Sequence, residues 1–155
     1  MDKPVELIEF ETMLLGRHDL ASRRVRTGGS LLDRSAYTLL SRIRMQGPMS
    51  IGQLSAAFDL DTSTLNRQTA AMLRDGLVER IPDPEGGIAR KFRITGEGER
   101  RLEDDRTAIV GSLEKIFANW TAEEVATFAA YLQRFNTDIE LQAGRPWPRP
   151  ATTGG

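Results

Sequence analysis

Apolar residues recur at helical spacing along most of the chain and alternate with polar residues in one short stretch. The first apolar group, within residues 5–15, predicts a helix that runs to about Arg24. The sequence RTGGS then predicts a loop, because consecutive glycines leave the backbone unconstrained. Asp33 has the chemistry of an N-cap for a second helix, which should end at the sequence QGP.

Two further helices follow, with a short turn between them. Ser50 and Gln53 have the spacing of a capping box, which predicts a short third helix that buries Leu54. Asp61 can cap a fourth helix, and Gly76 can end it in the left-handed conformation that glycine tolerates. Two helices joined by so short a turn are typical of a helix-turn-helix, whose second helix enters the DNA major groove.

The two sides of the fourth helix differ in chemistry. One side carries Leu65, Thr69, Met72 and Leu73 at helical spacing and should face the core. The other side carries small polar residues and arginines, which suit DNA, whereas an apolar outer face would favour a protein partner. These outer residues are Ser63, Asn66, Arg67, Ala70 and Arg74.

The alternating stretch comes directly after this helix and predicts a β-hairpin. Leu77, Val78 and Ile81 begin one strand, and the sequence DPEGG has turn chemistry. On the returning strand, apolar residues alternate with Lys91 and Arg93. A basic hairpin directly after a recognition helix is a wing, which reaches the adjacent minor groove or phosphates.

The distribution of charge and the scarcity of cysteine and histidine reduce the number of possible function classes. Residues 17–44 carry seven arginines against two aspartates, whereas residues 94–142 carry ten acidic residues against five basic ones. A basic middle suits a polyanion-binding protein, although a solvated charged surface gives the same pattern. The chain has no cysteine and a single histidine, which excludes thiolate and multi-histidine sites. We therefore expect neither an enzyme nor a cofactor.

The membrane is not an expected partner. No apolar run approaches the roughly 18 residues that span a bilayer, and the acidic amino terminus is unlike a signal peptide. These features predict a cytoplasmic protein.

Apolar residues also dominate both ends of the chain. They predict a long helix over 96–118 and a last helix that begins at the capping box of Thr121 and Glu124. These helices and the first one carry more apolar surface than a small lobe can cover, so a second copy of the chain is the expected cover. Alternatively, they complete the core of a monomer. Residues 143–155 are rich in proline, glycine and threonine and predict a disordered tail.

The sequence DTSTLNRQTAAMLRDGLVERIPDPEGGIARKFRITGEG resembles the MarR (multiple antibiotic resistance regulator) family of winged helix-turn-helix transcription factors, and the likeness covers about residues 5–141. The resemblance implies a mainly α fold with a small β-hairpin wing and terminal dimerisation helices. The expected parts are an N-terminal dimerisation helix and loop at 1–30, the DNA-binding lobe at 31–95, C-terminal dimerisation helices at 96–142 and the tail at 143–155.

The resemblance also implies a function. It is that of a sequence-specific regulator that binds double-stranded DNA as a homodimer on a pseudo-palindromic operator. Such a regulator is a repressor or an activator, and we expect a repressor that responds to a small aromatic or anionic effector. The alternative is a winged-helix protein-interaction module. The expected DNA contacts are Ser63, Thr64, Asn66, Arg67, Arg74, Arg90, Lys91 and Arg93. The implied effector crevice would be lined by Leu14, Arg17, His18 and Tyr37.

The wing departs from the pattern of the family it resembles. That pattern usually has an Asp-x-Arg element after the DPE turn, where this chain has Gly86, Gly87 and Ile88. Two outcomes are open: another cation among residues 90–93 replaces the wing-tip arginine, or the wing binds more weakly and moves more.

Overall fold

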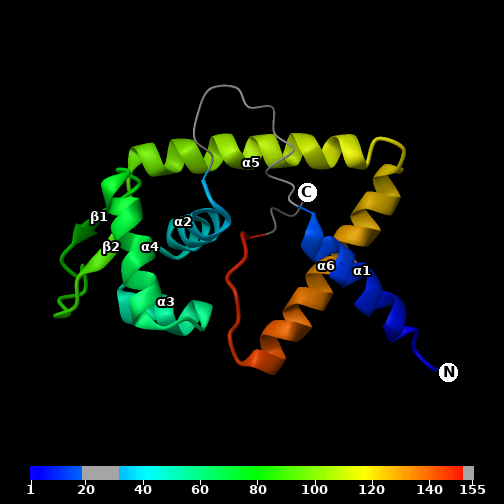
Figure 1. Cartoon of the computed structure of the whole chain (residues 1–155), viewed down its shortest axis with the longest axis horizontal. Coiled ribbons are helices and arrows are strands. Elements are labelled where there is room, and N and C mark those ends of the chain that lie inside the picture. The colour runs from blue at the N-terminus through cyan, green and yellow to red at the C-terminus, as the bar shows by residue number, and fades with distance from the viewer. Residues whose placement is uncertain (19–31, 152–155) are drawn as a thin grey trace.

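A computed structural model of the chain describes residues 1–18 and 32–151. In Figure 1, α2 to α4 and the hairpin form a lobe at one end, α1 and α6 lie at the other end, and α5 connects the two. This arrangement confirms the predicted fold, a mainly α winged helix with terminal helices. The elements are α1 (Val5–Arg17), α2 (Arg34–Gln46), α3 (Ile51–Phe58), α4 (Thr62–Arg74), β1 (Val78–Ile81), β2 (Lys91–Ile94), α5 (Gly96–Ile116) and α6 (Ala122–Ala143).

The predicted helix ends coincide with side-chain caps. Asp33 Oδ1 accepts a hydrogen bond from the Ala36 N–H at 2.7 Å. Capping boxes at the starts of α3 and α6 are both present as predicted. Gly76 follows α4 with a φ of 72°, in the left-handed region. Local sequence therefore sets where most of these helices begin and end.

The first helix is shorter than predicted. It ends at Arg17, because His18 has an extended backbone conformation with a ψ of 127°. Arg24 and the predicted RTGGS loop lie outside the described residues.

The hydrophobic core lies in the lobe. The strands pair antiparallel from Val78 with Ile94 to Ile81 with Lys91. Met49, in the α2–α3 connection, exchanges backbone hydrogen bonds of 3.1 and 2.8 Å with Phe92. This bridge ties the hairpin to the helices, so the wing has a fixed place relative to α4. The core residues are Leu32, Leu39, Leu40, Ile43, Met49, Leu54, Leu65, Met72, Leu77, Val78, Phe92 and Leu102.

Gly98 in the first turn of α5 has no room for a side chain. A Cβ atom there would lie 2.1 Å from the Leu77 carbonyl oxygen. We expect Gly98→Ala to lower the free energy of unfolding by about 1–3 kcal/mol, because backbone atoms must move to relieve the clash. Gly96→Ala is the matched control, since its Cβ would meet nothing within 4 Å. Urea unfolding measures both, and an equal effect of the two substitutions would contradict this explanation.

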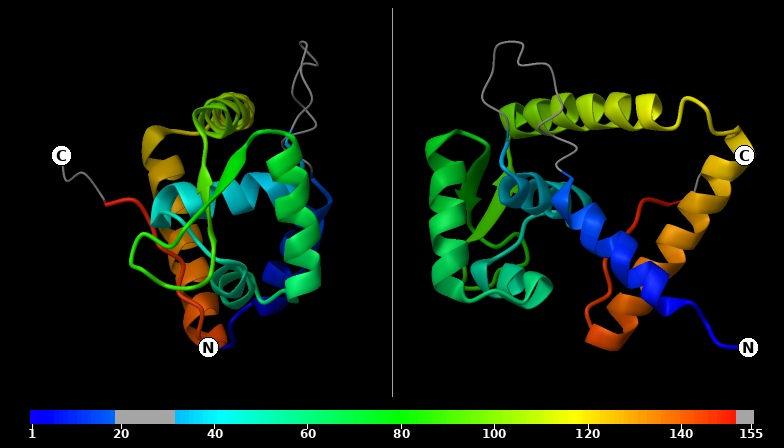
Figure 2. Two further views of the ribbon diagram at one scale, coloured as in Figure 1. Left: turned by 90° about the vertical axis from the view of Figure 1, so that its left-hand side faces the viewer. Right: turned by 45° about the vertical axis from the view of Figure 1, so that its right-hand side comes forward.

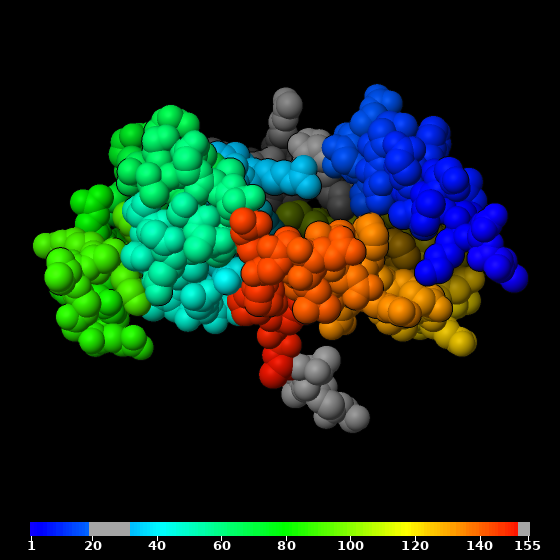
Figure 3. Space-filling view, turned by 90° about the horizontal axis from the view of Figure 1, so that it is seen from below, coloured from blue at the N-terminus to red at the C-terminus, as the bar shows by residue number. Residues whose placement is uncertain are grey.

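The terminal helices bury almost nothing within one chain. Neither α1 nor α6 contains a buried residue. Their surfaces lie next to each other at the end of the molecule away from the lobe (Figure 3). The large hydrophobic side chains exposed there include Leu7, Ile8, Phe10, Phe128, Leu132, Phe135 and Ile139.

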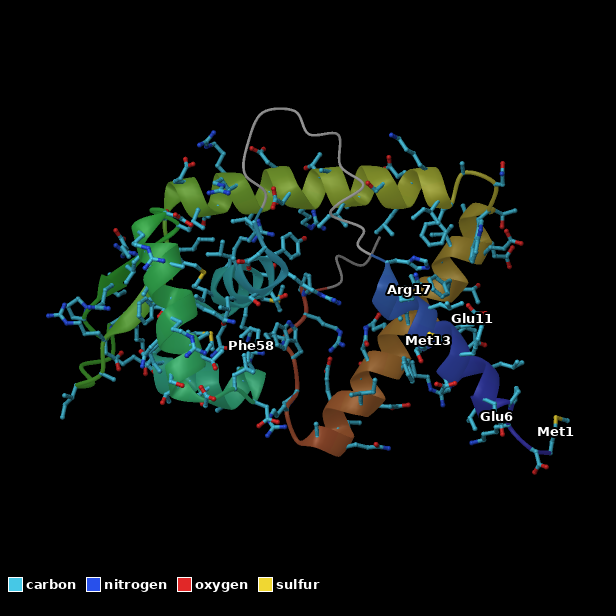
Figure 4. All side chains as sticks on the ribbon, viewed as in Figure 1. Met1, Glu6, Glu11, Met13, Arg17 and Phe58 are labelled. Atoms are coloured by element: carbon cyan, nitrogen blue, oxygen red, sulfur yellow. The ribbon has the colours of Figure 1, made fainter. Side chains whose placement is uncertain are left out.

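Residues 144–151, which belong to the segment predicted to be a disordered tail, include an aromatic contact with the lobe. The indole of Trp147 packs edge-on against Phe58, with ring centres 5.2 Å apart. The Arg42 guanidinium lies 4.5 Å from the centre of the same indole ring. Figure 4 shows Phe58 at the end of α3, facing the segment that follows α6. Aromatic and cation–π packing thus holds Trp147 against the lobe in this structure.

Candidate nucleic-acid interface

The outer face of α4 is fixed by its cap and its buried side. Asp61 accepts a hydrogen bond from the Thr64 N–H at 2.7 Å, and this cap satisfies one free amide of the first turn. Leu65, Thr69 and Met72 are buried, as predicted. The opposite face of α4 is therefore held toward solvent, at the end of the molecule away from α6 (Figure 1).

The residues predicted to contact DNA from α4 lie together on this face. The Ser63 hydroxyl donates to Asp61 Oδ1 at 2.8 Å, and Arg67 Nη2 donates to Thr64 Oγ1 at 3.3 Å. Asn66 and Arg74 are exposed, and neither side chain has a hydrogen bond or ion pair with residues 1–18 or 32–151. The face offers amide, hydroxyl and guanidinium groups, which can bond to base edges and phosphates.

The acidic cap of α4 makes the stability of this helix depend on pH. Hydrogen bonds from the Thr64 N–H and the Ser63 hydroxyl lower the pKa of Asp61 from 3.8 to about 2. The ionised carboxylate therefore stabilises the fold fully above its unfolded pKa, and this contribution is lost as the pH falls toward about 2.

We expect Asp61→Ala to lower the urea midpoint by its full amount at pH 5 and above, and the gap to wild type to shrink as the pH falls toward about 2. Asp61→Asn is the control, because it keeps a capping oxygen that does not titrate. A gap that stays constant from pH 5 to pH 2 would show that ionisation of Asp61 does not stabilise α4.

Most cations of the wing are engaged within the hairpin. Lys91 Nζ lies 3.4 Å from Asp83 Oδ1, and Arg93 Nε donates to Glu79 Oε1 at 2.8 Å. Arg90 is exposed and has no ion pair with the described residues. Of the three cations considered as replacements for the wing-tip arginine, Arg90 is thus the one left without an acidic partner in the described part of the chain.

Arg80 is a fourth cation of the hairpin, which the sequence reasoning missed. It lies on β1 and stacks its guanidinium 5.6 Å from the centre of the Phe92 ring. No local pattern marks Arg80, because its stacking partner Phe92 lies opposite it on the other strand. Figure 2, in its left panel, shows the hairpin crossing the same end of the molecule as α4.

The turn at the tip of the wing is organised around Asp83. Its carboxylate accepts a hydrogen bond from the Glu85 N–H at 2.9 Å. This hydrogen bond, followed by the charge of Lys91, lowers the pKa of Asp83. A Cβ atom on Gly87 would lie 2.2 Å from Asp83 Oδ2, so glycine suits this closed turn.

The cavity beside α4 and the cavity at the start of α6 are lined by none of the four residues of the expected effector crevice. Arg17 and His18 are exposed at the end of α1, and Leu14 is half-buried on the same helix. Figure 4 shows Arg17 at the end of α1 that lies opposite Met1. Tyr37 lies on α2, where burial raises the pKa of its hydroxyl against the opposing charge of Arg106.

A cavity of about 330 Å³ lies between the start of α2, the side of α4 next to α2, and the start of α5. Arg67, Gln68 and Met72 of α4 contribute to its wall, together with Arg101 of α5. Gln68 Oε1 is buried and accepts no hydrogen bond from the described residues. The cavity therefore combines apolar walls, charged groups and an unused acceptor next to the recognition helix.

The described residues contain neither a membrane-spanning helix nor a cluster of metal ligands. Over residues 1–18 and 32–151, no helix is long and apolar enough to cross a membrane. In the same ranges, no three acidic, histidine or cysteine side chains are grouped so that they could hold a metal ion.

Known proteins are similar to this chain in sequence. A sequence model described as the MarR family matches residues 32–86. An uncharacterized HTH-type transcriptional regulator, YxaD of Bacillus subtilis (strain 168), is 37% identical over 135 residues, covering 86% of this chain and 93% of the relative. The HTH-type transcriptional repressor IacR of Pseudomonas putida is 27% identical over 110 residues, covering 71% of this chain and 62% of the relative.

Solved structures agree on the fold. A crystal structure of MarR superposes with a TM-score of 0.74 at 22% identity, covering 93% of this chain and 97% of that one. A mutant MarR from E. coli complexed with operator DNA has a TM-score of 0.61 at 20% identity, covering 87% of this chain and 99% of that one. The extent and identity of the match to YxaD, together with the family match over the lobe, show that this chain belongs to the MarR family of transcriptional regulators.

Proposed function

We propose that this protein is a homodimeric repressor that binds a pseudo-palindromic operator sequence-specifically and releases it in response to a small effector. The observation that carries the proposal is the outer face of α4, where Asn66, Arg67 and Arg74 are exposed beside a hairpin that is tied to the lobe. The related MarR from E. coli has been crystallised with operator DNA, which supports DNA as the partner. The proposal includes no catalytic step.

The dimer is supported by the terminal helices. An isolated monomer would expose apolar side chains along both α1 and α6, which contain no buried residue. A two-fold partner covers such surfaces most simply, and it would place two recognition helices roughly 34–36 Å apart, one turn of DNA. The alternative, in which these helices complete a monomer core, is disfavoured because they are exposed in the single chain.

Sequence-specific binding is tested by selecting DNA from a randomised duplex pool. The protein should enrich a pseudo-palindrome, and its affinity for that duplex should fall steeply as the salt concentration rises. Enrichment of no sequence, together with weak binding to all duplexes, would instead favour the protein-interaction module.

Control by an effector is supported by the cavity beside α4. Its volume of about 330 Å³ is in the range of small-ligand sites, and Arg67 and Arg101 on its wall suit an anionic compound. Bound ligand would shift operator affinity only through a different affinity for the DNA-competent state. A regulator controlled solely by its own abundance is the alternative.

We expect at least one aromatic acid from a panel to raise the melting temperature and to weaken operator binding by about 5- to 150-fold. The response should survive in reducing buffer, because the chain contains no cysteine that could act as a redox switch. Thermal shift and fluorescence anisotropy measure the two effects. A complete lack of response to the panel would support control by abundance.

The protein should lower the transcription of the genes that its operator controls. Repression is supported by the relative IacR, whose name describes a transcriptional repressor. A reporter gene placed behind the selected duplex should be expressed less when the protein is present, and activation of the reporter would contradict repression.

A further inference from the structure

The tip of the wing carries a fully exposed aliphatic side chain. Ile88 is 104% exposed, whereas the exposed large hydrophobic residues of α1, α5 and α6 are between 39% and 72% exposed. Single surface hydrophobics are common, and exposure alone assigns no role to Ile88. Its position is the second observation. The loop between β1 and β2 lies at the end of the molecule opposite α1 and α6 (Figure 1), so a partner covering those helices would leave Ile88 uncovered.

The loop that carries Ile88 is held in one conformation by hydrogen bonds and an ion pair. The Gly86 N–H donates to the Asp83 carbonyl at 3.0 Å, and the Asp83 carboxylate is bonded to the Glu85 N–H and paired with Lys91. These contacts order the turn before any partner arrives. Less conformational entropy is therefore lost when the tip binds, and a side chain at this tip can be inserted at a defined depth.

The charged residues around the tip of the wing indicate which kind of partner Ile88 contacts. Lys91 and Arg93 are each paired with a carboxylate of the hairpin, while Arg90 has no ion pair with the described residues. The tip thus combines one aliphatic side chain with one available guanidinium. The DNA minor groove accepts this combination, because its negative potential attracts arginine and its base steps can be opened by an aliphatic wedge.

We propose that Ile88 is an apolar wedge that enters the minor groove beside each half-site and partly unstacks one base step, while Arg90 contacts the adjacent groove or phosphate. The inference rests on the proposed binding of double-stranded DNA. Such a wedge favours pyrimidine–purine steps, which unstack most easily. The wing then contributes to sequence preference through the deformability of DNA, without a hydrogen bond to a base.

The probe is the duplex that the wild-type protein enriches from the random pool, with 2-aminopurine placed in turn at each adenine flanking the half-sites. Wild-type protein should raise the 2-aminopurine fluorescence at one step per half-site. Ile88→Ala should abolish that rise and weaken binding roughly 5- to 50-fold, because three buried carbons are lost from the contact. Ile88→Leu should retain most of the fluorescence rise.

The salt dependence of DNA binding distinguishes the role of Ile88 from that of Arg90. Ile88→Ala should leave the slope of log affinity against log salt unchanged, since no phosphate contact is removed. Arg90→Ala should make that slope shallower by about one if the guanidinium lies on a phosphate. Ala89→Ser is the matched control on the same exposed loop and should bind as wild type. The melting temperature should not change in Ile88→Ala, because the replaced side chain packs against nothing in the chain.

Two results would overturn the wedge while leaving the proposed function intact. One is equal affinity of Ile88→Ala and wild type, and the other is the absence of any 2-aminopurine signal at the flanks of a tightly bound duplex. A change in oligomeric state without a change in DNA affinity would also overturn it, because Ile88 would then contact protein. Failure of the wild type to enrich any duplex would overturn the proposed function itself.

Discussion

Replacing Arg67 by alanine should weaken operator binding by roughly 1–3 kcal/mol and relax the preference at one base pair in each half-site. Arg67 lies on the exposed face of α4, where its guanidinium donates one long hydrogen bond of 3.3 Å to the Thr64 hydroxyl. That bond can be exchanged for guanine O6 and N7 at little cost. Anisotropy titrations with each half-site position varied in turn measure both effects.

The matched control is Arg134→Ala, which removes the same charge from an exposed position on α6. It should leave operator affinity unchanged. If Arg67→Ala weakened binding to all duplex variants by the same factor, Arg67 would be a phosphate contact, and base reading would have to come from another residue, such as Asn66.

Replacing Phe135 by glutamate should convert the protein from a dimer to a monomer and reduce operator affinity by roughly 100-fold or more. Phe135 belongs to an apolar stripe on α6, with Phe128, Leu132 and Ile139 at spacings of three and four residues. A buried carboxylate without a partner opposes association. A monomer then binds one half-site alone and loses the gain in affinity that two linked half-sites provide.

Sedimentation velocity at micromolar concentration measures the oligomeric state, and anisotropy measures the affinity. Ala130→Glu is the control, because Ala130 lies on the opposite side of the same helix and its substitution adds the same charge. If the Phe135→Glu variant were still a dimer, Phe135 and the apolar stripe of α6 would not form the dimer interface. A wild-type monomer at this concentration would contradict the homodimer altogether.

The recognition helix shows how far the sequence alone reaches. Its N-cap, its C-terminal glycine and its buried side were all predicted, and the structure contains each of them. Caps and periodicity involve residues within about four positions of one another, so they can be read without knowing the tertiary fold. The residues also predicted the wing and the terminal helices, and the family resemblance joined these parts into one architecture.

The wing shows where such reasoning ends. The sequence marks Arg90, Lys91 and Arg93 as equally basic, but pairing across the hairpin brings Glu79 to Arg93, and the turn brings Asp83 to Lys91. Which cation remains available depends on cross-strand register, which composition does not contain. The same limit explains the missed Arg80, whose guanidinium stacks on a ring from the other strand.

The sequence by itself determined the helices, the hairpin and the polar outer face of α4, because each is specified by neighbouring residues and by binary patterning. Only the tertiary structure decided that Trp147 contacts the lobe, since Phe58 and Arg42 lie about 90 and 105 residues away from it in sequence. It also decided that the cavity next to α4 is lined by three helices. Contacts between distant residues depend on how the elements pack, and no local pattern encodes that packing.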